Sequence, residues 1–362
     1  MRLNICLCPG DGIGAEVTRE AVRVLEQVCR SFHHELHTAE GLLGGVAIQA
    51  TGSPFPEETR AKCLAADATL MGAVGLPEFD HLPPEKRPER GLLAIRAALG
   101  VYANLRPVRS YRALLDASPL KNDRIDGVDL IIVRELLGGV YYGAPRGISG
   151  EGPTERGTNT MTYTRAEIER VARVAFHLAR NRRKKVTSVD KSNVLEVSQL
   201  WRRVVTEVAA QFPEVELDHL LVDNCAMQLV LNPKRFDVVL MENMFGDILS
   251  DEGAVLAGSI GLLPSASLGN QQPSGAWVGL YEPVHGSAPD LAGKNLANPL
   301  GAIGSVAAML EYSFGLKAEA AAVTAAVETV LDAGRVTRDL GGEATTQEVG
   351  AAVCEVIAHG GF

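Results

Sequence analysis

Two aspartates, Asp247 and Asp251, lie four residues apart in the segment NMFGDILSD. In a helix this spacing places both carboxylates on one face, where their like charges destabilise the helix. A bound cation would account for the pair, and carboxylate oxygens completed by substrate oxygens and waters suit Mg²⁺ or Mn²⁺. Asp223, just past an expected strand, is a third candidate ligand. The alternative is a pair of solvated acids on a helix surface.

Three arginines stand in apolar surroundings: Arg96 in LLAIRAAL, Arg106 in ANLRPV and Arg134 in LIIVREL. A buried guanidinium needs an anionic partner, and its planar fork matches a carboxylate. For any one arginine a structural salt bridge would serve as well as a substrate. Three of them beside an acidic metal site favour a small polycarboxylate held by arginine and metal together.

Lys191 in SVDKSN and Tyr141 in GGVYYG are candidates for proton transfer. A lysine whose pKa is lowered by neighbouring cations can act as a general base, and a tyrosine can donate a proton. His285 in EPVHGSAPD is a candidate cofactor contact. Each also has an ordinary interpretation, as a surface lysine, a packed tyrosine and a histidine in a turn.

The segment from Gly10 to Ala15 matches the dinucleotide fingerprint G-x-G-x-x-A. That fingerprint requires an acidic residue at the end of the next strand, and the segment FHHELHTAE is a poor buried strand. Asp11 would also place a carboxylate close to the pyrophosphate. The motif therefore indicates either a tight structural turn or a phosphate cradle.

The elements that position these residues alternate between strand and helix, which predicts an α/β protein with a largely parallel sheet. Thr164 and Glu167 form a capping box that starts a long helix. Residues 147–159 are polar and glycine-rich and predict an exposed arm, and residues 253–281 predict a buried helix followed by an irregular loop at 264–279. Strands are expected at 3–8, 68–74, 128–133, 185–189, 215–222 and 236–240, and helices at 17–28, 91–99, 196–210 and in three alanine-rich segments after 298.

Composition limits the classes of function. The 362 residues suffice for two domains, and the net charge of −9 argues against binding to nucleic acid or to an anionic membrane. Six scattered cysteines without a CxxC pair predict reduced thiols in a cytoplasmic protein. The apolar stretch before Asp11 is too short for a signal peptide.

These segments together resemble the β-decarboxylating dehydrogenase family, whose members act on isopropylmalate, isocitrate, homoisocitrate, tartrate or D-malate. The likeness runs in family order over nearly the whole chain and is greatest to the branch that oxidises 3-isopropylmalate in leucine biosynthesis. The matching segments are PGDGIG at 9–14, NLRP at 104–107, VREL at 133–136, GGVYYGAPRG at 138–147, SVDKSNVL at 188–195, VDNCAMQL at 222–229, NMFGDILSD at 243–251, LLPSASLG at 262–269 and EPVHGSAPDLAGKNLANP at 282–299.

The resemblance implies a two-domain α/β fold that is not of the Rossmann type. A discontinuous first domain would comprise 1–101 and 262–362 and hold most of an NAD site. A second domain, 102–261, would pair two subunits in a homodimer, with an arm at about 139–160 crossing between them. Lys191, Asn193, Val194 and Asp223 would then reach the partner's active site.

The resemblance also implies a role for each polar residue. Arg96, Arg106 and Arg134 would bind the malate carboxylates, and Mg²⁺ or Mn²⁺ would lie between Asp247, Asp251 and the partner's Asp223. Lys191 would take the hydroxyl proton, and Tyr141 would supply the proton after CO₂ leaves. NAD would contact Ile13, Glu89, Glu282, His285, Gly286, Ser287, Ala288, Asp290 and Asn298.

Specificity is implied by two further sets of residues. Asp290 would accept both ribose hydroxyls and repel a 2′-phosphate, which favours NAD over NADP. Leu92, Leu93 and the partner's Val194 would surround the isopropyl group. Arg90, beside this pocket, leaves open oxidation of homoisocitrate or isocitrate, and a non-catalytic regulatory paralogue is a further alternative.

Overall fold

The computed structural model describes residues 1–360, and it divides into two compact units. The first unit comprises 1–101, 110–119 and the chain from 257 onward, and the second comprises 102–109 and 120–256. Residues 110–119 and 257–261 thus belong to the first unit, whereas the family likeness assigned them to the second domain. The reason is local packing, because η3 (Arg112–Ala117) packs against α11 (Lys317–Asp332) and Gly258 lies against Ala117.

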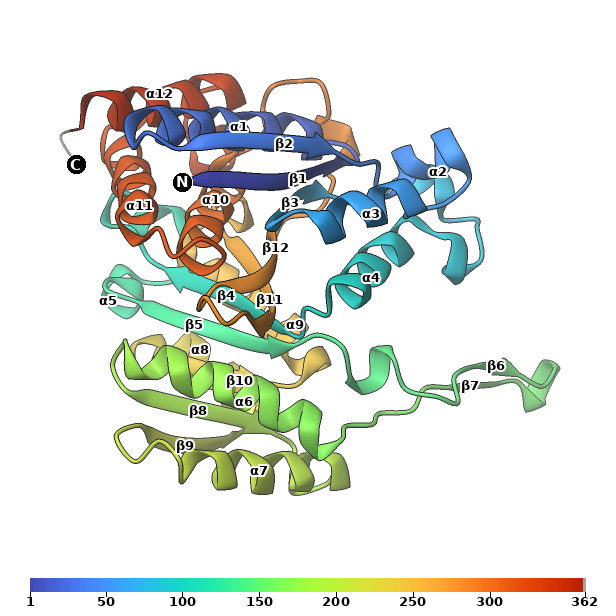
Figure 1. The fold of residues 1–362 in the computed structure, drawn as a ribbon. Coiled ribbons are helices and arrows are strands. Elements are labelled where there is room, and N and C mark those ends of the chain that lie inside the picture. The colour runs from blue at the N-terminus through green and yellow to red at the C-terminus, as the bar shows by residue number, and fades with distance from the viewer. Residues whose placement is uncertain (361–362) are drawn as a thin grey trace. The chain divides into compact units, whose positions relative to one another are not determined.

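The first unit contains strands in the order β2-β1-β3-β12-β11 (Figure 1). β1 pairs in parallel with β2 and β3, β12 pairs in parallel with β3, and β11 and β12 are antiparallel. β1 is an interior strand whose residues 5–8 are all buried, whereas β2 is a largely exposed edge strand. The strands are β1 (Arg2–Gly10), β2 (Glu35–Glu40), β3 (Ala68–Ala73), β11 (Pro264–Gln271) and β12 (Trp277–Pro283).

Four long helices of the first unit pack against one another, and α10 also packs on β11 and β12. The expected helix at 17–28 lies within α1, whose valines and leucines recur at helical spacing and are buried. The three alanine-rich segments are helices, as predicted. The helices are α1 (Gly14–Ser31), α2 (Gly45–Thr51), α3 (Glu57–Ala65), α4 (Pro88–Leu99), α10 (Leu300–Tyr312), α11 (Lys317–Asp332) and α12 (Thr346–His359).

The loop predicted at 264–279 is wrong, because β11 and β12 form a hairpin there. Small side chains allow close packing, and Ser265 and Ser267 are buried in β11 beneath α10. The turn itself is confined to 272–276 between the strands. The composition of this segment is therefore that of an irregular loop, but packing against α10 stabilises it as a pair of strands.

The second unit contains strands in the order β4-β5-β10-β8-β9, parallel except for the antiparallel pair β4 and β5. Helices α6 and α7 pack together on these strands, and the predicted Thr164–Glu167 capping box begins α6. The elements are β4 (Ala103–Arg109), α5 (Asn122–Ile125), β5 (Asp129–Glu135), α6 (Arg165–Arg180), β8 (Lys185–Asp190), α7 (Glu196–Ala209), β9 (Glu216–Leu221), α8 (Val222–Leu231), β10 (Val238–Met241) and α9 (Asn243–Ala257).

The predicted arm is a two-stranded hairpin of β6 (Gly147–Ser149) and β7 (Arg156–Thr158), separate from the large sheet (Figure 1). Its side chains are mostly exposed, including the large apolar side chain of Ile148. Over residues 1–360, no helix has both the length and the apolar character needed to cross a membrane.

Candidate active site

Asp247 and Asp251 lie on α9, which starts two residues after the end of the buried strand β10. Arg106 enters from β4, and its Nη1 donates to Asp251 Oδ1 at 3.0 Å and to Ser250 Oγ at 2.6 Å. Its Nε donates to Asn104 Oδ1 at 3.0 Å. The guanidinium is buried, whereas the Asp251 side chain is 59% exposed. The buried, positively charged guanidinium of Arg106 therefore pairs with the solvent-accessible carboxylate of Asp251.

Arg134 comes from β5 and donates from Nη1 to Asp247. Its Nε and Nη2 both donate to Asn243 Oδ1, at 3.1 and 2.9 Å. Gly246 makes room for this arginine, because a Cβ there would lie 2.5 Å from the Arg134 Cγ. The pocket for the buried arginine is thus formed by residues of the same segment that carries the acid pair.

Tyr141, in η4 (Gly139–Tyr141), donates its hydroxyl to Asp247 Oδ2 at 2.9 Å. Burial and then the Asp247 carboxylate raise the pKa of Tyr141 to about 12. The phenol therefore stays protonated at neutral pH, as a proton donor must. The hydrogen bonds bring together five residues from the sequence prediction: Arg106, Arg134, Tyr141 and the acid pair on α9.

Lys191 follows β8, and its Nζ lies 2.7 Å from Asp223 Oδ1 at the start of α8. This hydrogen bond lowers the pKa of Asp223. Over residues 1–360, Lys191 has its ion pair with Asp223 and not with Asp247 or Asp251. Asn193 and Val194, next to Lys191, are exposed. This group therefore forms a separate polar cluster within one chain.

Arg96 belongs to the first unit, where its Nη2 donates to Glu282 Oε1 of β12 at 2.9 Å. Both side chains are about nine-tenths buried. The Nε of Arg96 is buried and has no hydrogen-bond partner among the described residues. An internal salt bridge thus satisfies part of this guanidinium and leaves a donor for another acceptor.

The turn from Gly10 to Gly14 is stabilised by Asp11, which is fully buried. Its carboxylate accepts backbone N–H groups from Gly45 at 2.8 Å, Val46 at 2.9 Å and Gly75 at 2.8 Å. Gly12 has a positive φ of 57°, and a Cβ there would lie 2.1 Å from the Ser287 carbonyl oxygen. Of the two interpretations of the motif, these bonds favour the structural turn.

This turn contacts the segment expected to bind NAD, because Ile13 N donates to the Ser287 carbonyl at 2.8 Å. His285 is buried, and burial lowers the pKa of its imidazole. Its Nδ1 lies 2.9 Å from the Gly286 carbonyl, and its Nε2 has no hydrogen-bond partner in the described part of the chain. Ala288 has an unusual φ of 36°.

The other predicted cofactor contacts differ in exposure. Asp290 is exposed in η8 (Pro289–Leu291), as a residue that meets a ribose must be. Asn298 is buried, donates to Asp339 Oδ2 at 3.0 Å and accepts from Leu300 N. Its side chain therefore already has structural partners.

The residues predicted for the isopropyl pocket lie on two segments, α4 for Leu92 and Leu93 and the loop after β8 for Val194. Leu92 packs against a buried cluster, and Glu89, a predicted NAD contact on α4, is exposed. Arg90 is exposed on the same helix.

The sequence prediction missed the groups that hold the arginines. Asn243 accepts from Arg134 and donates to the carbonyls of Leu136 and Gly138 at 3.2 and 3.0 Å. Ser250 Oγ and Asn104 Oδ1 accept hydrogen bonds from Arg106. Asn243, a polar residue two positions after the buried strand β10, was the available signal.

The mixed α/β fold with arginine, tyrosine and acid side chains at one end of β10 defines the class of protein. The chain belongs to the isocitrate/isopropylmalate dehydrogenase family, which it matches over residues 4–353, and it is an oxidoreductase.

Among curated relatives, the 3-isopropylmalate dehydrogenase of Halalkalibacterium halodurans is 55% identical over 99% of this chain and 98% of its own length. That of Geobacillus kaustophilus is 58% identical over 93% of this chain and 90% of its own. Among solved structures, isocitrate dehydrogenase from Methylococcus capsulatus has a TM-score of 0.86 at 34% identity and covers 98% of this chain and 99% of its own.

Proposed function

We propose that this enzyme catalyses the oxidative decarboxylation of 3-isopropylmalate to 4-methyl-2-oxopentanoate and CO₂, with reduction of NAD, in leucine biosynthesis in the cytoplasm. The relatives above 50% identity bear this enzyme name, whereas the isocitrate dehydrogenase is 34% identical. The observation that carries the proposal is the buried pair Arg106 and Arg134 beside Asp247, Asp251 and Tyr141.

Carboxylates of the substrate bind to the arginine forks. Arg106 and Arg134 are held from behind by Asn104, Ser250 and Asn243, so their orientation costs no reorganisation on binding. Arg96 contributes its unpartnered Nε to a further carboxylate oxygen.

Mg²⁺ or Mn²⁺ fits the acid pair, because both side chains are accessible and offer the hard oxygens that these ions prefer. Asp247, Asp251 and the partner's Asp223 would hold the ion. When bound, the ion supplies Lewis acidity to the substrate hydroxyl and to the enolate that decarboxylation leaves. The exposed Asp251 carboxylate is free to exchange its contact with Arg106 for one with the ion.

Proton transfers fall to Lys191 and Tyr141. Lys191 of the partner subunit would accept the proton from the C2 hydroxyl as the substrate is oxidised, and the nicotinamide, when bound, would supply the hydride acceptor. Tyr141 donates its hydroxyl proton to the carbon that loses CO₂, and its raised pKa keeps that proton in place until it is needed.

The nicotinamide cofactor binds over the segment 285–290 and the turn at Ile13. The buried, unpartnered Nε2 of His285 fits a hydrogen bond to such a group, since an orphaned polar atom in a protein interior is costly. Exposed Asp290 would accept the ribose hydroxyls and repel a 2′-phosphate, which supports NAD over NADP.

The enzyme functions as a homodimer with shared active sites. Large apolar side chains are exposed on α8 and α9, and the arm carries another in Ile148; such surfaces are typical of subunit interfaces. The helices that carry Met227, Leu231, Ile248 and Val255 would pair between subunits, which would bring Lys191 and Asp223 to the partner's acid pair.

The test is the initial rate of NADH formation with Mg²⁺, using 3-isopropylmalate, isocitrate, homoisocitrate and D-malate under one set of conditions. We expect 3-isopropylmalate to react faster by orders of magnitude, with NAD preferred to NADP. Arg90→Ala is the matched variant, and its rate with 3-isopropylmalate should equal that of the wild type. A preference for a tricarboxylate that Arg90→Ala removes would replace the proposal with homoisocitrate or isocitrate oxidation. No rate with any substrate would favour the regulatory paralogue.

A further inference from the structure

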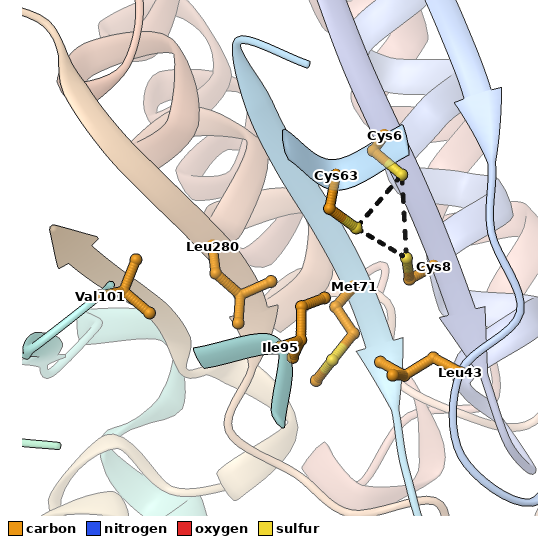
Figure 2. Packing of buried hydrophobic residues seen from close by; sticks show 8 residues of the cluster. All are labelled: Cys6, Cys8, Leu43, Cys63, Met71, Ile95, Val101 and Leu280. Carbon is orange, nitrogen blue, oxygen red and sulfur yellow. Dashed lines mark hydrogen bonds between the residues drawn. The ribbon is translucent and has the colours of Figure 1, made fainter. Parts of the chain in front are cut away.

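Three cysteines of the first unit converge in its buried core (Figure 2). Cys6 and Cys8 are two residues apart on β1 and therefore project from the same face of the sheet. Cys63 reaches them from α3, which lies over that face. All three are free thiols with at most 2% of their surface exposed.

The three sulfurs form a nearly equilateral triangle. The Sγ of Cys63 lies 3.6 Å from that of Cys6 and 4.0 Å from that of Cys8, and Cys6 and Cys8 are 4.0 Å apart. The point equidistant from the three sulfurs lies about 2.2 Å from each, close to a metal–thiolate bond length. We propose that Cys6, Cys8 and Cys63 bind one soft metal ion, and that this ion is copper(I).

The surroundings favour a three-coordinate ion over zinc. Structural zinc takes four ligands in a tetrahedron. Among residues 1–360, these three cysteines are the only cluster of three or more His, Cys, Asp or Glu side chains with ligand atoms close enough for one ion. Leu43, Met71 and Ile95 belong to the same buried cluster, so the surroundings of the three sulfurs are largely apolar. Thiolate sulfurs select copper(I) or zinc, and of these copper(I) accepts three sulfurs in a plane.

The three thiols share one network of S–H···S hydrogen bonds, so each sulfur already faces the other two. Binding replaces S–H bonds by metal–sulfur bonds and releases the protons to solvent, with no change of oxidation state.

Two further features suit the site. Thr69 lies opposite Cys6 in the strand register, and its buried hydroxyl has no hydrogen-bond partner within the described residues, so it can donate to a metal-bound sulfur. Entry requires only a local opening, because Cys63 and Thr59 are the sole buried residues of α3. A bound ion would fasten α3 to β1, the strand that leads into the Asp11 turn.

The test is anaerobic titration of the reduced, metal-free full chain with copper(I) against a chromophoric copper(I) chelator. Wild type should take up one copper(I) per chain. The control Cys29→Ala removes a buried helical thiol outside the cluster and should bind as wild type does. Cys63→Ala and Cys8→Ala should each lose at least about 100-fold in affinity.

Two readouts do not depend on a variant that folds. The Tm of the wild type should rise with one equivalent of copper(I), because an ion that binds the native state stabilises it. X-ray absorption should show three sulfur neighbours. Absence of binding, equal binding by Cys63→Ala, or two sulfur neighbours would overturn the site. Stoichiometric Zn²⁺ binding without copper(I) binding would overturn the choice of ion. None of these readouts uses turnover, so the result is independent of the proposed function.

Discussion

Asp11 in the first unit and Asp251 in the second carry the same carboxylate in different surroundings. Asp11 is fully buried, and three backbone N–H groups satisfy it. Asp251 is 59% exposed, and its partner is the Arg106 side chain. The first carboxylate stabilises the fold, since removing it leaves one buried and two part-buried N–H donors without their acceptor. The second can exchange its partner at little cost, as a ligand for a metal ion must.

Burial and hydrogen-bond partners distinguish structural acids from candidate functional acids more clearly than sequence motifs do. Asp11 lies in the segment that matches a cofactor fingerprint, yet its hydrogen bonds hold a turn. Asp247 and Asp251 lie in a segment without a general fingerprint, yet two buried arginines and a tyrosine meet there. Four predictions test this distinction.

Lys191 belongs to the exposed type, since its ion pair with Asp223 is accessible to solvent. Lys191→Ala should lower kcat about 10³-fold, because a general base contributes on this scale. The dimer, NAD binding and Tm should stay as in the wild type. Lys185→Ala is the matched control, because Lys185 pairs with Glu216 at nearly the same exposure. Steady-state kinetics of both variants and the wild type measure kcat. Normal turnover by Lys191→Ala would show that this residue is not the general base.

Asp11→Ala should lower the free energy of unfolding by about 3 kcal/mol, because one buried and two part-buried N–H groups lose their charged acceptor. Asp67→Ala is the control, since this exposed carboxylate accepts from Asn4 N at 3.0 Å and water can replace it. Urea unfolding of both variants measures the difference. If Asp11→Ala lowers the free energy of unfolding no more than Asp67→Ala does, the structural role assigned to Asp11 is wrong.

Asp251→Asn should weaken metal binding and leave the stability of the fold nearly unchanged, the opposite of what we expect for Asp11→Ala. We expect the affinity for Mg²⁺ or Mn²⁺ to fall by about 100-fold or more, and the free energy of unfolding to change by less than about 1 kcal/mol. Glu207→Gln, which also removes an exposed partner of an arginine, should leave metal affinity unchanged. Calorimetric titration with Mn²⁺ measures the affinity, and an unchanged value would exclude Asp251 as a ligand.

The smallest expected effect is the change in the pKa of Tyr141 when Mg²⁺ is added. This pKa is raised to about 12 by burial and by the negative charge of Asp247, so bound Mg²⁺ should lower it by offsetting that charge. The absorbance difference between wild type and Tyr141→Phe, followed at 295 nm up to high pH, isolates this phenol. Its ionisation should move to lower pH when Mg²⁺ is added. No movement would place the ion away from Asp247.

Local spacing in the sequence was enough to predict most strands and helices, the Thr164–Glu167 cap and the common face of Asp247 and Asp251. These features depend on neighbours within one or two turns. The family likeness supplied roles that no spacing contains, and the assignment of the site residues remains a proposal.

Only the tertiary structure decided which distant groups meet. Arg134 and Asp247 are 113 residues apart and Cys6 and Cys63 are 57 apart, and no local pattern links either pair. The hairpin of β11 and β12 has the composition of a loop, and packing beneath α10 makes it a strand pair. Sequence determines the chemical types available and their local periodicity. Burial decides which charge is enclosed, as at Asp11, and which stays open to a ligand, as at Asp251, because desolvation and hydrogen bonding depend on the whole fold.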